Sequence, residues 1–495
     1  MATIDARNHL LWRVLVENLE RGRADETALA GTRIVSYASL TAAVVAGSAE
    51  IDDRFSPGSR LLVASRNQLH VAIALLAALA SRCVPLLSDP TSPERLRRTA
   101  REWDAVGGIG ERVALADSGL RILDGTRIEA WIEAPPAMID RFEPRPVAAD
   151  APAFWTFTSG TTGEPKAVLH AHRGPRAAYE GFAVHVLDLG PEDVTVATAG
   201  LPFVYALGNA LLFPLMAGAT AILPVDLLLP TVLGELARHG ATVLVAGPWS
   251  LAAIARLVRR PRHVDALRCL RLVLSAGEPL SRRVFDAWVE RFGKRVLDNL
   301  GCTEMFNPFV SNLPENARSD SLGRPVPGFE VRVAGAAPAP GRRGPLSVAG
   351  ASRAVAVGSG GMLSPVEGVA CETGDEVAVE ADGALVFLGR IDDAFKVKGQ
   401  FVRPVEVERC LTTVPGVVEC LVLPDRDESG VTLVIARIVP STAARHDDLV
   451  RRVLRHARAS LPPFAVPERV EMVKELPRSD RGKLQRPRIE RAERP

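Results

Sequence analysis

Short strand-like and helix-like segments alternate through the first 390 residues, and this alternation constrains the fold more than any other feature. The segment LLVAS (61–65) is apolar and as long as a buried strand, HVAIALLAALA (70–80) predicts a buried helix, and CVPLL (83–87) predicts a second strand. Pro93 directly after Ser92 predicts the start of the next helix, because serine caps helices and proline suits their first position. This alternation is typical of an α/β fold with mostly parallel strands. Further strands are predicted at ATAIL (219–223), TVLVAG (242–247), RLVLSAG (271–277) and RVLDNLG (295–301).

The pattern changes near residue 330, where short strands follow one another. The pair Asp382–Gly383 inside EVAVEADGALVFLG (376–389) is typical of a hairpin turn, so we expect a small β-rich subdomain there. After GRIDD (389–393), a third pattern of paired strands and helices predicts an α+β unit. We therefore expect a large N-terminal domain over 1–390, made of α/β subdomains plus the β-rich one, and a small, mobile α+β C-terminal domain over 391–495.

The overall charge of the chain gives no sign of a nucleic-acid or membrane partner. Lys and Arg number 60 against 58 Asp and Glu, and the arginines are spread along the chain. The six cysteines match no zinc-binding spacing, which favours a reduced cytoplasmic protein. The N-terminal residues carry charges where a signal peptide has an apolar core, and the longest apolar run (71–80) is half as long as the roughly 20 residues that cross a bilayer. We expect a cytoplasmic protein that binds neither nucleic acid nor membranes.

The segment TFTSGTTGEPK (156–166) combines glycines, hydroxyl side chains and a lysine directly after an aromatic strand. Its backbone N–H groups and hydroxyls suit a ligand rich in acceptors, such as phosphate. It is not a Walker loop, because Gly163 and Lys166 are not adjacent. The following AVLHAH (167–172) predicts a strand, with a helix beginning only near Pro175, so the loop is expected to join two strands. The same composition also suits a flexible connection without a ligand.

Several motifs in order resemble the adenylate-forming enzymes, the superfamily of acyl- and aryl-CoA ligases, peptide-synthetase adenylation domains and beetle luciferases. TFTSGTTGEPK resembles the family's phosphate loop, and the resemblance covers nearly the whole chain. LPFVYALGNALLFPLMAGATAIL (201–223) and LDNLGCTEMFNPFVSN (297–312) resemble the benzoate-CoA ligase branch. The other matching segments are LSAGEPL (274–280) on the adenine side, LGCTE (300–304), ETGD (372–375) and GRIDD (389–393) at the ribose and hinge, and LPRSDRGKLQR (476–486) near the C-terminus.

The resemblance implies ATP-dependent activation of a small aryl or heteroaryl carboxylic acid to an acyl-adenylate, followed by transfer to a thiol of coenzyme A. ATP and Mg²⁺ are implied as well. A carboxylate that attacks a triphosphate is repelled by it, so catalysis requires groups that neutralise charge and align the reactants. By this resemblance Lys483 bridges the carboxylate and the α-phosphate, Thr303 contacts the α-phosphate, and Glu304 carries Mg²⁺. The other residues implied at the nucleotide are Thr158, Ser159, Gly160, Thr161, Thr162, Gly163 and Lys166 at the β- and γ-phosphates, Ser275, Ala276, Gly277 and Glu278 on the adenine side, and Asp375 with Arg390 at the ribose.

The acyl pocket, the hinge and the thiol tunnel are implied by the same resemblance. Asp392 falls at the family's hinge, and Lys398 and Gly399 fall where the family forms its pantetheine tunnel. Asn307 stands where the benzoate branch often has histidine, so its amide is expected to contact a ring hydroxyl, amine or heteroatom. Leu300 replaces the tyrosine that stacks on adenine in many members. The residues expected to line the acyl pocket are Phe203, Tyr205, Ala206, Trp249, Asn307 and Pro308.

Alternatives stay open at this point, both for the residues and for the function. Glu304 is also compatible with the start of a helix, Asp375 with a turn, and Lys483 with a solvated tail. Phe203 and Trp249 are also compatible with packing in a hydrophobic core. The second functional hypothesis is a stand-alone acyl-AMP ligase that loads the phosphopantetheine of a carrier protein. A third, of another class, is a nucleotide-binding protein that has lost its chemistry, against which the intact charged residues of the motifs argue.

Overall fold

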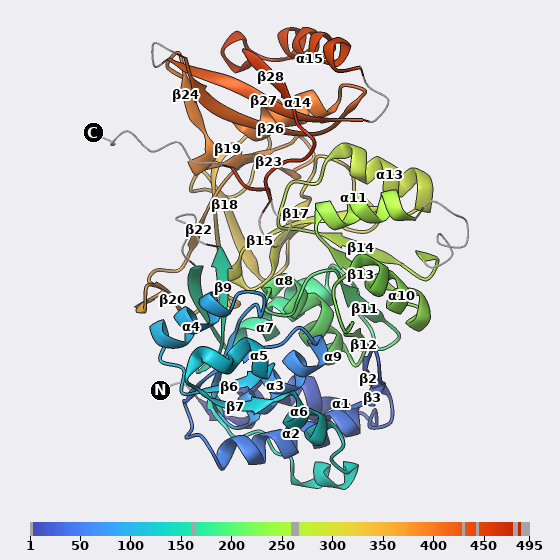
Figure 1. Cartoon of the computed structure of the whole chain (residues 1–495), viewed down its shortest axis with the longest axis vertical. Helices are drawn as coiled ribbons and strands as arrows, with labels where there is room; N and C mark the ends of the chain where they lie inside the picture. The colour runs from blue at the N-terminus through green and yellow to red at the C-terminus, as the bar shows by residue number, and fades with distance from the viewer. Residues whose placement is uncertain are drawn as a thin grey trace.

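The structure, a computed structural model of the chain, describes residues 3–159, 165–258, 267–427, 431–441, 445–478 and 484–486. Two large sheets with their helices form the N-terminal part, and a smaller unit that carries α15 and β28 lies at the other end of the molecule (Figure 1). Both large sheets contain parallel strands linked through helices, which confirms the predicted α/β architecture.

The first large sheet has eight strands in the order β21-β20-β10-β9-β5-β4-β6-β7. The predictions for 61–87 are confirmed by β4 (Arg60–Ala64), α3 (Gln68–Ala80) and β5 (Val84–Leu87). Helix α4 (Pro93–Glu102) begins as predicted, because the Ser92 hydroxyl accepts a hydrogen bond from the Arg95 N–H at 3.3 Å. The other strands are β6 (Gly107–Gly110), β7 (Arg121–Asp124), β9 (Pro152–Ser159), β10 (Pro165–Ala171), β20 (Ala356–Ser359) and β21 (Met362–Pro365).

The second large sheet has nine strands in the order β17-β16-β15-β14-β13-β11-β12-β2-β3. Its strands from β15 to β2 run parallel, so their carboxyl ends lie at one edge of the sheet, where ligands bind in open α/β sheets. The four strands predicted in this region are confirmed. The bounds are β2 (Thr27–Ala30), β3 (Val35–Ser36), β11 (Val194–Ala197), β12 (Thr220–Ile222), β13 (Val243–Ala246), β14 (Leu272–Ser275), β15 (Val296–Gly301), β16 (Pro308–Ser311) and β17 (Arg324–Pro325). Helices α10 (Leu229–His239), α11 (Pro248–Leu257) and α13 (Arg282–Phe292) belong to the same part of the chain.

A four-stranded antiparallel sheet forms the predicted β-rich subdomain. Its last two strands are joined by the turn that the Asp-Gly pair predicted, and Gly383 in this turn has φ +85°. The hairpin of β20 and β21 comes from the same part of the sequence but joins the first large sheet instead, where β20 pairs with β10. The strands of the small sheet are β18 (Phe329–Val333), β19 (Arg343–Gly350), β22 (Cys371–Val379) and β23 (Leu385–Arg390).

The C-terminal unit has its own hydrophobic core, formed by buried residues between Val397 and Ala465. The strands predicted to pair, β26 (Val417–Arg426) and β27 (Thr432–Pro440), are antiparallel neighbours. The other elements are β24 (Phe395–Val397), β25 (Gln400–Val402), α14 (Pro404–Thr412), α15 (His446–Ser460) and β28 (Arg469–Met472). Within the described ranges, no helix is both long enough and apolar enough to cross a bilayer.

Candidate active site

Strands β9 and β10 form a hairpin whose connection is the predicted phosphate loop. Thr158 pairs with Lys166 and Ser159 with Pro165, so the prediction that this loop joins two strands is confirmed. Thr158 is half-buried and Lys166 is exposed. Gly160, Thr161, Thr162 and Gly163 lie outside the described residues. Helix α7 (Arg173–Ala178) begins two residues before the predicted start at Pro175.

The structure places Asp375 and Arg390 side by side on neighbouring strands, β22 and β23. The Arg390 Nη1 donates to the Asp375 Oδ1 at 3.1 Å and to the Thr373 carbonyl at 2.9 Å. Asp375 is almost fully buried, whereas the Arg390 side chain is 38% exposed. Arg390 thus neutralises the buried Asp375 carboxylate and fixes its orientation.

Gly374 is the reason that Arg390 can lie so close to this strand. A Cβ atom on Gly374 would be 2.7 Å from the Arg390 Nη2, and the residue has φ +74°. Because Asp375 is the carboxylate predicted to bind the ribose of ATP, and its charge-assisted contact with Arg390 would be displaced, we expect Gly374→Ala to raise the KM for ATP about tenfold with little change in kcat. Gly383→Ala is the matched control, since Gly383 has φ +85° in the same hairpin but nothing within 4 Å of its Cβ position. Equal KM values for the two variants, measured by pyrophosphate release, would contradict this explanation.

The adenine-side and G-C-T-E segments lie at adjacent strand ends. Ser275 ends β14 and pairs with Asp298 of the neighbouring parallel strand β15, which leads into a turn at Thr303–Met305. Burial raises the pKa of Asp298 to about 7, and the Ser275 hydroxyl and nearby backbone N–H groups oppose this shift. Thr303 and Glu304 are both half-buried. The two predicted nucleotide segments are therefore brought to the same edge of the sheet.

The residues present fit a magnesium ion that is shared with the nucleotide. Among the described residues, no three His, Cys, Asp or Glu side chains gather as a metal cage would require. The half-buried Glu304 is one carboxylate, and Mg²⁺ is commonly held by one or two carboxylates together with substrate phosphates. Glu304 with the phosphate oxygens of ATP would hold the ion, which would supply positive charge at the phosphates.

Three asparagines form hydrogen bonds with one another or with Tyr205, a residue of the predicted acyl-pocket wall, which comprises Phe203, Tyr205, Ala206, Trp249, Asn307 and Pro308. Asn209 lies in a π-helical turn (Gly208–Leu212), and its Nδ2 donates to the Asn307 Oδ1 at 2.6 Å and to the Tyr205 carbonyl at 2.9 Å. The Asn299 Nδ2 donates to the Tyr205 hydroxyl at 3.1 Å and to the Ser275 carbonyl at 3.1 Å. Burial raises the pKa of Tyr205 far above its usual range, so the phenol stays protonated. The wall and the adenine-side segment therefore share the Asn299 amide.

The other predicted pocket residues differ in their surroundings. Ala206 is buried in α8 (Val204–Leu207), and Pro308 is buried at the start of β16. Phe203 packs against the main core, but Trp249 on α11 is 44% exposed, so it is not a core residue. Sequence reasoning missed Asn209 and Asn299. The signal that was available is an asparagine in an otherwise apolar run, where a buried amide requires partners.

The residues predicted at the hinge and the thiol tunnel lie at the start of the C-terminal unit. Asp392 lies in a short 3₁₀ turn (Ile391–Asp393) and is exposed. Lys398 and Gly399 form the exposed two-residue turn of the hairpin between β24 and β25, with φ values of +50° and +82°. Lys398 Nζ lies 3.9 Å from the Glu468 carboxylate. Lys483 lies outside the described residues.

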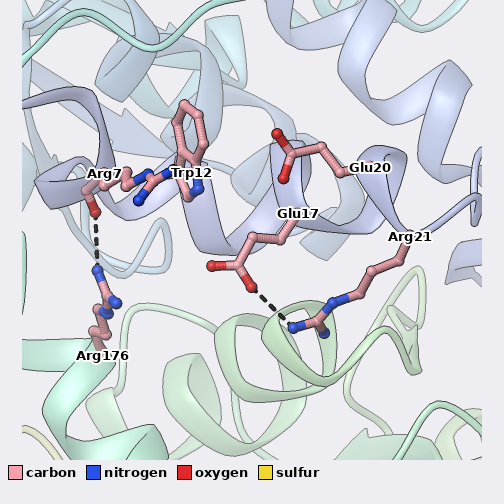
Figure 2. Close-up of a pocket in the computed structure, with 6 residues that line it drawn as sticks. All are labelled: Arg7, Trp12, Glu17, Glu20, Arg21 and Arg176. Atoms are coloured by element: carbon pink, nitrogen blue, oxygen red, sulfur yellow. Dashed lines mark hydrogen bonds and ion pairs between the residues drawn. The ribbon is translucent and has the colours of Figure 1, made fainter.

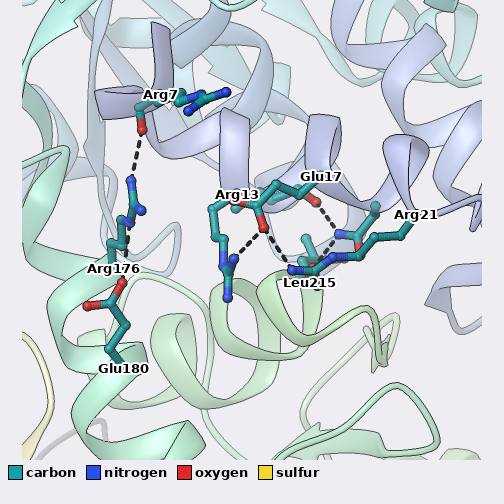
Figure 3. A network of polar contacts seen from close by, with 9 residues as sticks. Arg7, Arg13, Glu17, Arg21, Arg176, Glu180 and Leu215 are labelled. Atoms are coloured by element: carbon teal, nitrogen blue, oxygen red, sulfur yellow. Dashed lines mark hydrogen bonds and ion pairs between the residues drawn. The ribbon is translucent and has the colours of Figure 1, made fainter. Parts of the chain in front are cut away.

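A separate hollow lies in the N-terminal part of the molecule. Several of its charged side chains already have partners (Figure 3): Glu17 accepts from Arg21 at 3.1 Å and from Arg13, and Arg176 donates to the Arg7 carbonyl at 2.9 Å. No predicted site residue lines this hollow, so it is not the candidate active site. The hollow measures about 380 Å³ and is lined by Arg7, Trp12, Glu17, Glu20, Arg21 and Arg176 (Figure 2).

Most of the chain matches two known protein-domain families. Residues 16–358 match the family of AMP-binding enzymes, and residues 406–483 match the AMP-binding enzyme C-terminal domain. A 4-hydroxybenzoate–CoA/benzoate–CoA ligase of Rhodopseudomonas palustris is 35% identical over 69% of this chain and 65% of its own length. A p-hydroxybenzoic acid–AMP ligase of Mycobacterium tuberculosis is 32% identical over 97% of this chain and 68% of its own length. The matched part thus spans about two thirds of each of these relatives.

The fold has a close counterpart among solved structures. A crystal structure of an anthranilate CoA ligase in complex with anthranoyl-AMP matches with a TM-score of 0.85 and 26% identity, over 97% of both chains. The family predicted from the ordered motifs and the predicted likeness to its benzoate-CoA ligase branch are both confirmed. By its sequence and its fold, the chain belongs to the family of AMP-binding enzymes.

Proposed function

We propose that the chain activates a small aryl carboxylic acid with ATP to an acyl-adenylate and then transfers the acyl group to the thiol of coenzyme A. The observation that carries the proposal is the Asn299 amide, which binds both the Tyr205 hydroxyl and the Ser275 carbonyl at 3.1 Å. This contact joins the predicted acyl-pocket wall to the adenine-side segment. An acyl-adenylate requires this arrangement, because its acyl group and its adenosine are linked through a single phosphate.

The charges around this junction suit the first half-reaction. Glu304 would hold Mg²⁺ with the phosphates, and Thr303 beside it would contact the α-phosphate. Asp375, held by Arg390, would accept from the ribose hydroxyls. Lys166 and Lys483 supply the positive charge that a carboxylate attacking a triphosphate requires. Each group acts by binding, orienting or neutralising, which is how catalysis of such a transfer is achieved.

The aryl class of the acid is supported by the composition of the wall. The predicted pocket residues are mostly apolar or aromatic, among them Tyr205, Ala206 and Pro308, and such a composition suits a flat ring. The amide of Asn307 is engaged by Asn209 at 2.6 Å and by the Val204 carbonyl at 3.0 Å. Relatives named for benzoate, hydroxybenzoate and anthranilate accord with a ring that carries a small polar substituent.

The proposal is tested by acid-dependent pyrophosphate release across a panel of benzoate, hydroxybenzoates, anthranilate, heteroaryl acids and short alkyl acids. We expect at least one aryl acid to be turned over, and short alkyl acids to give far less product. Turnover confined to alkyl acids would overturn the aryl assignment. No release with any acid would favour the hypothesis of a nucleotide-binding protein without catalysis.

The thiol acceptor is a separate prediction. The relative that matches 97% of this chain is named an AMP ligase, which keeps a carrier protein as the alternative acceptor. With its preferred acid and ATP, we expect the enzyme to form thioester on free coenzyme A at least about tenfold faster than on a phosphopantetheinylated carrier protein. Mass spectrometry of both products measures the ratio. Rapid loading of the carrier with next to none on coenzyme A would establish the alternative.

A further inference from the structure

Glu278 contacts the C-terminal unit on both sides of the segment that contains Lys483. The residue lies just after β14, in a turn where Gly277 has φ +93°. Its Oε1 accepts a hydrogen bond from the backbone N–H of Leu484 at 2.7 Å. Its Oε2 lies 3.7 Å from the Arg478 Nη1. Leu484 directly follows Lys483 in the chain, and Arg478 lies shortly before it.

The two flanks of this segment are also joined to each other. Arg478 and Leu484 form an antiparallel β-bridge, and the Gln485 N–H donates to the Pro477 carbonyl at 2.8 Å. Glu278 therefore binds two flanking residues that are themselves paired, rather than two independent residues.

Arg478 lies between two carboxylates that belong to different parts of the molecule. Its Nη2 donates to the Glu419 Oε2 of β26 at 3.0 Å, and Arg256 of α11 lies 3.7 Å from the other Glu419 oxygen. The side chains of Arg478, Glu278 and Glu419 are 21%, 17% and 24% exposed. The Arg478–Glu419 contact is a charge-assisted hydrogen bond, and at this low exposure both ion pairs of Arg478 are less screened than surface pairs.

We propose that Glu278 is a positioning residue for adenylate formation: it holds the base of the Lys483 segment against the large domain and does not serve to bind adenine. This inference rests on the proposed function, because Lys483 matters only if the chain forms an acyl-adenylate. It replaces the expectation from the motif that Glu278 binds the nucleotide. The carboxylate is already occupied by the Leu484 N–H and the Arg478 guanidinium.

Loss of this contact is expected to affect one half-reaction. A displacement of about 1 Å at a catalytic group costs up to roughly a hundredfold in rate. Thioester formation from supplied acyl-adenylate does not use Lys483 in the proposed scheme, so it should be retained. The split between the half-reactions separates a positioning role from general destabilisation.

The experiment compares Glu278→Ala, Glu278→Gln and Arg478→Ala in the full chain. Acid-dependent pyrophosphate release is followed as a function of ATP concentration, and thioester formation is followed from synthetic acyl-adenylate. Asp320→Asn is the matched control, because Asp320 forms another ion pair with the C-terminal unit, to Arg409 at 3.2 Å, away from this segment. Asparagine also tolerates the φ of +62° at this position.

We expect Glu278→Ala and Arg478→Ala to lower kcat for pyrophosphate release by about tenfold or more with little change in the KM for ATP. Glu278→Gln keeps an acceptor for the Leu484 N–H and should fall between the alanine variant and the wild type. Asp320→Asn should stay within about twofold. In all variants, thioester formation should stay within about twofold of the wild type.

Two results would overturn the inference. A raised KM for ATP at unchanged kcat in Glu278→Ala, with no effect of Arg478→Ala, would establish adenine binding instead. Equal loss of both half-reactions would show that Glu278 only stabilises the fold. Failure of the proposed function is distinguishable from either, because wild-type enzyme would then release no pyrophosphate with any acid.

Discussion

Lys483→Ala is expected to slow acid-dependent pyrophosphate release by about a hundredfold or more, because one positive group that stabilises the transition state is lost. The acid carboxylate and the α-phosphate both carry negative charge, and the attack brings them together. A lysine that bridges them offsets this repulsion only while the bond forms, so the loss should appear in kcat rather than in the KM for ATP. Single-turnover pyrophosphate release with the preferred acid measures the effect.

Lys474→Ala is the control for this variant. Lys474 is exposed and belongs to the same C-terminal part of the chain, so its loss changes the local charge equally. We expect it to leave pyrophosphate release within about twofold of the wild type. Thioester formation from supplied acyl-adenylate should survive in both variants. If Lys483→Ala releases pyrophosphate as fast as Lys474→Ala, Lys483 has no role in the chemistry.

Local sequence patterns predicted the elements that depend on a few neighbouring residues. Ser92 followed by Pro93 marked a helix start, since a cap requires only its own side chain and the first turn. The strands before and after the predicted phosphate loop could also be predicted from the sequence, because β9 and β10 are adjacent in it. The pair Asp382–Gly383 predicted a turn through its own backbone preferences.

Contacts between distant segments could not be predicted in this way. The hairpin of β20 and β21 pairs with β10, although its own sequence gives no sign of which sheet it joins. Glu278 and Leu484 are 206 residues apart, and Asn209 and Asn307 are 98 apart. Such partners depend on the packing of whole domains, so a motif shows that a residue matters without showing what it touches. Glu278 illustrates the difference, because its motif gave no sign of its contacts with Leu484 and Arg478 of the C-terminal unit.

The predicted hinge at Asp392 gives the second large expected effect. Asp392→Pro is expected to retain adenylate formation and to lose thioester formation by roughly tenfold or more, because the backbone that must rotate between the half-reactions is stiffened. Proline fixes φ near −65°, a value typical of the 3₁₀ turn at Ile391–Asp393, so the described conformation should be tolerated. The two half-reactions are measured separately, as pyrophosphate release and as thioester formation from supplied acyl-adenylate.

One contact between the C-terminal unit and the rest of the chain is a partly solvated ion pair. Arg409 and Asp320 lie 3.2 Å apart with side chains 31% and 33% exposed, and partly solvated ion pairs of this kind contribute about 1 kcal/mol or less each. The backbone at Asp392 should therefore limit the motion more than this ion pair does. Asp392→Ala is the matched control, since it removes the same carboxylate but leaves φ free, and it should retain thioester formation. If both variants lose thioester formation equally, the carboxylate matters rather than the hinge, and if Asp392→Pro loses both half-reactions, the substitution has disrupted the fold.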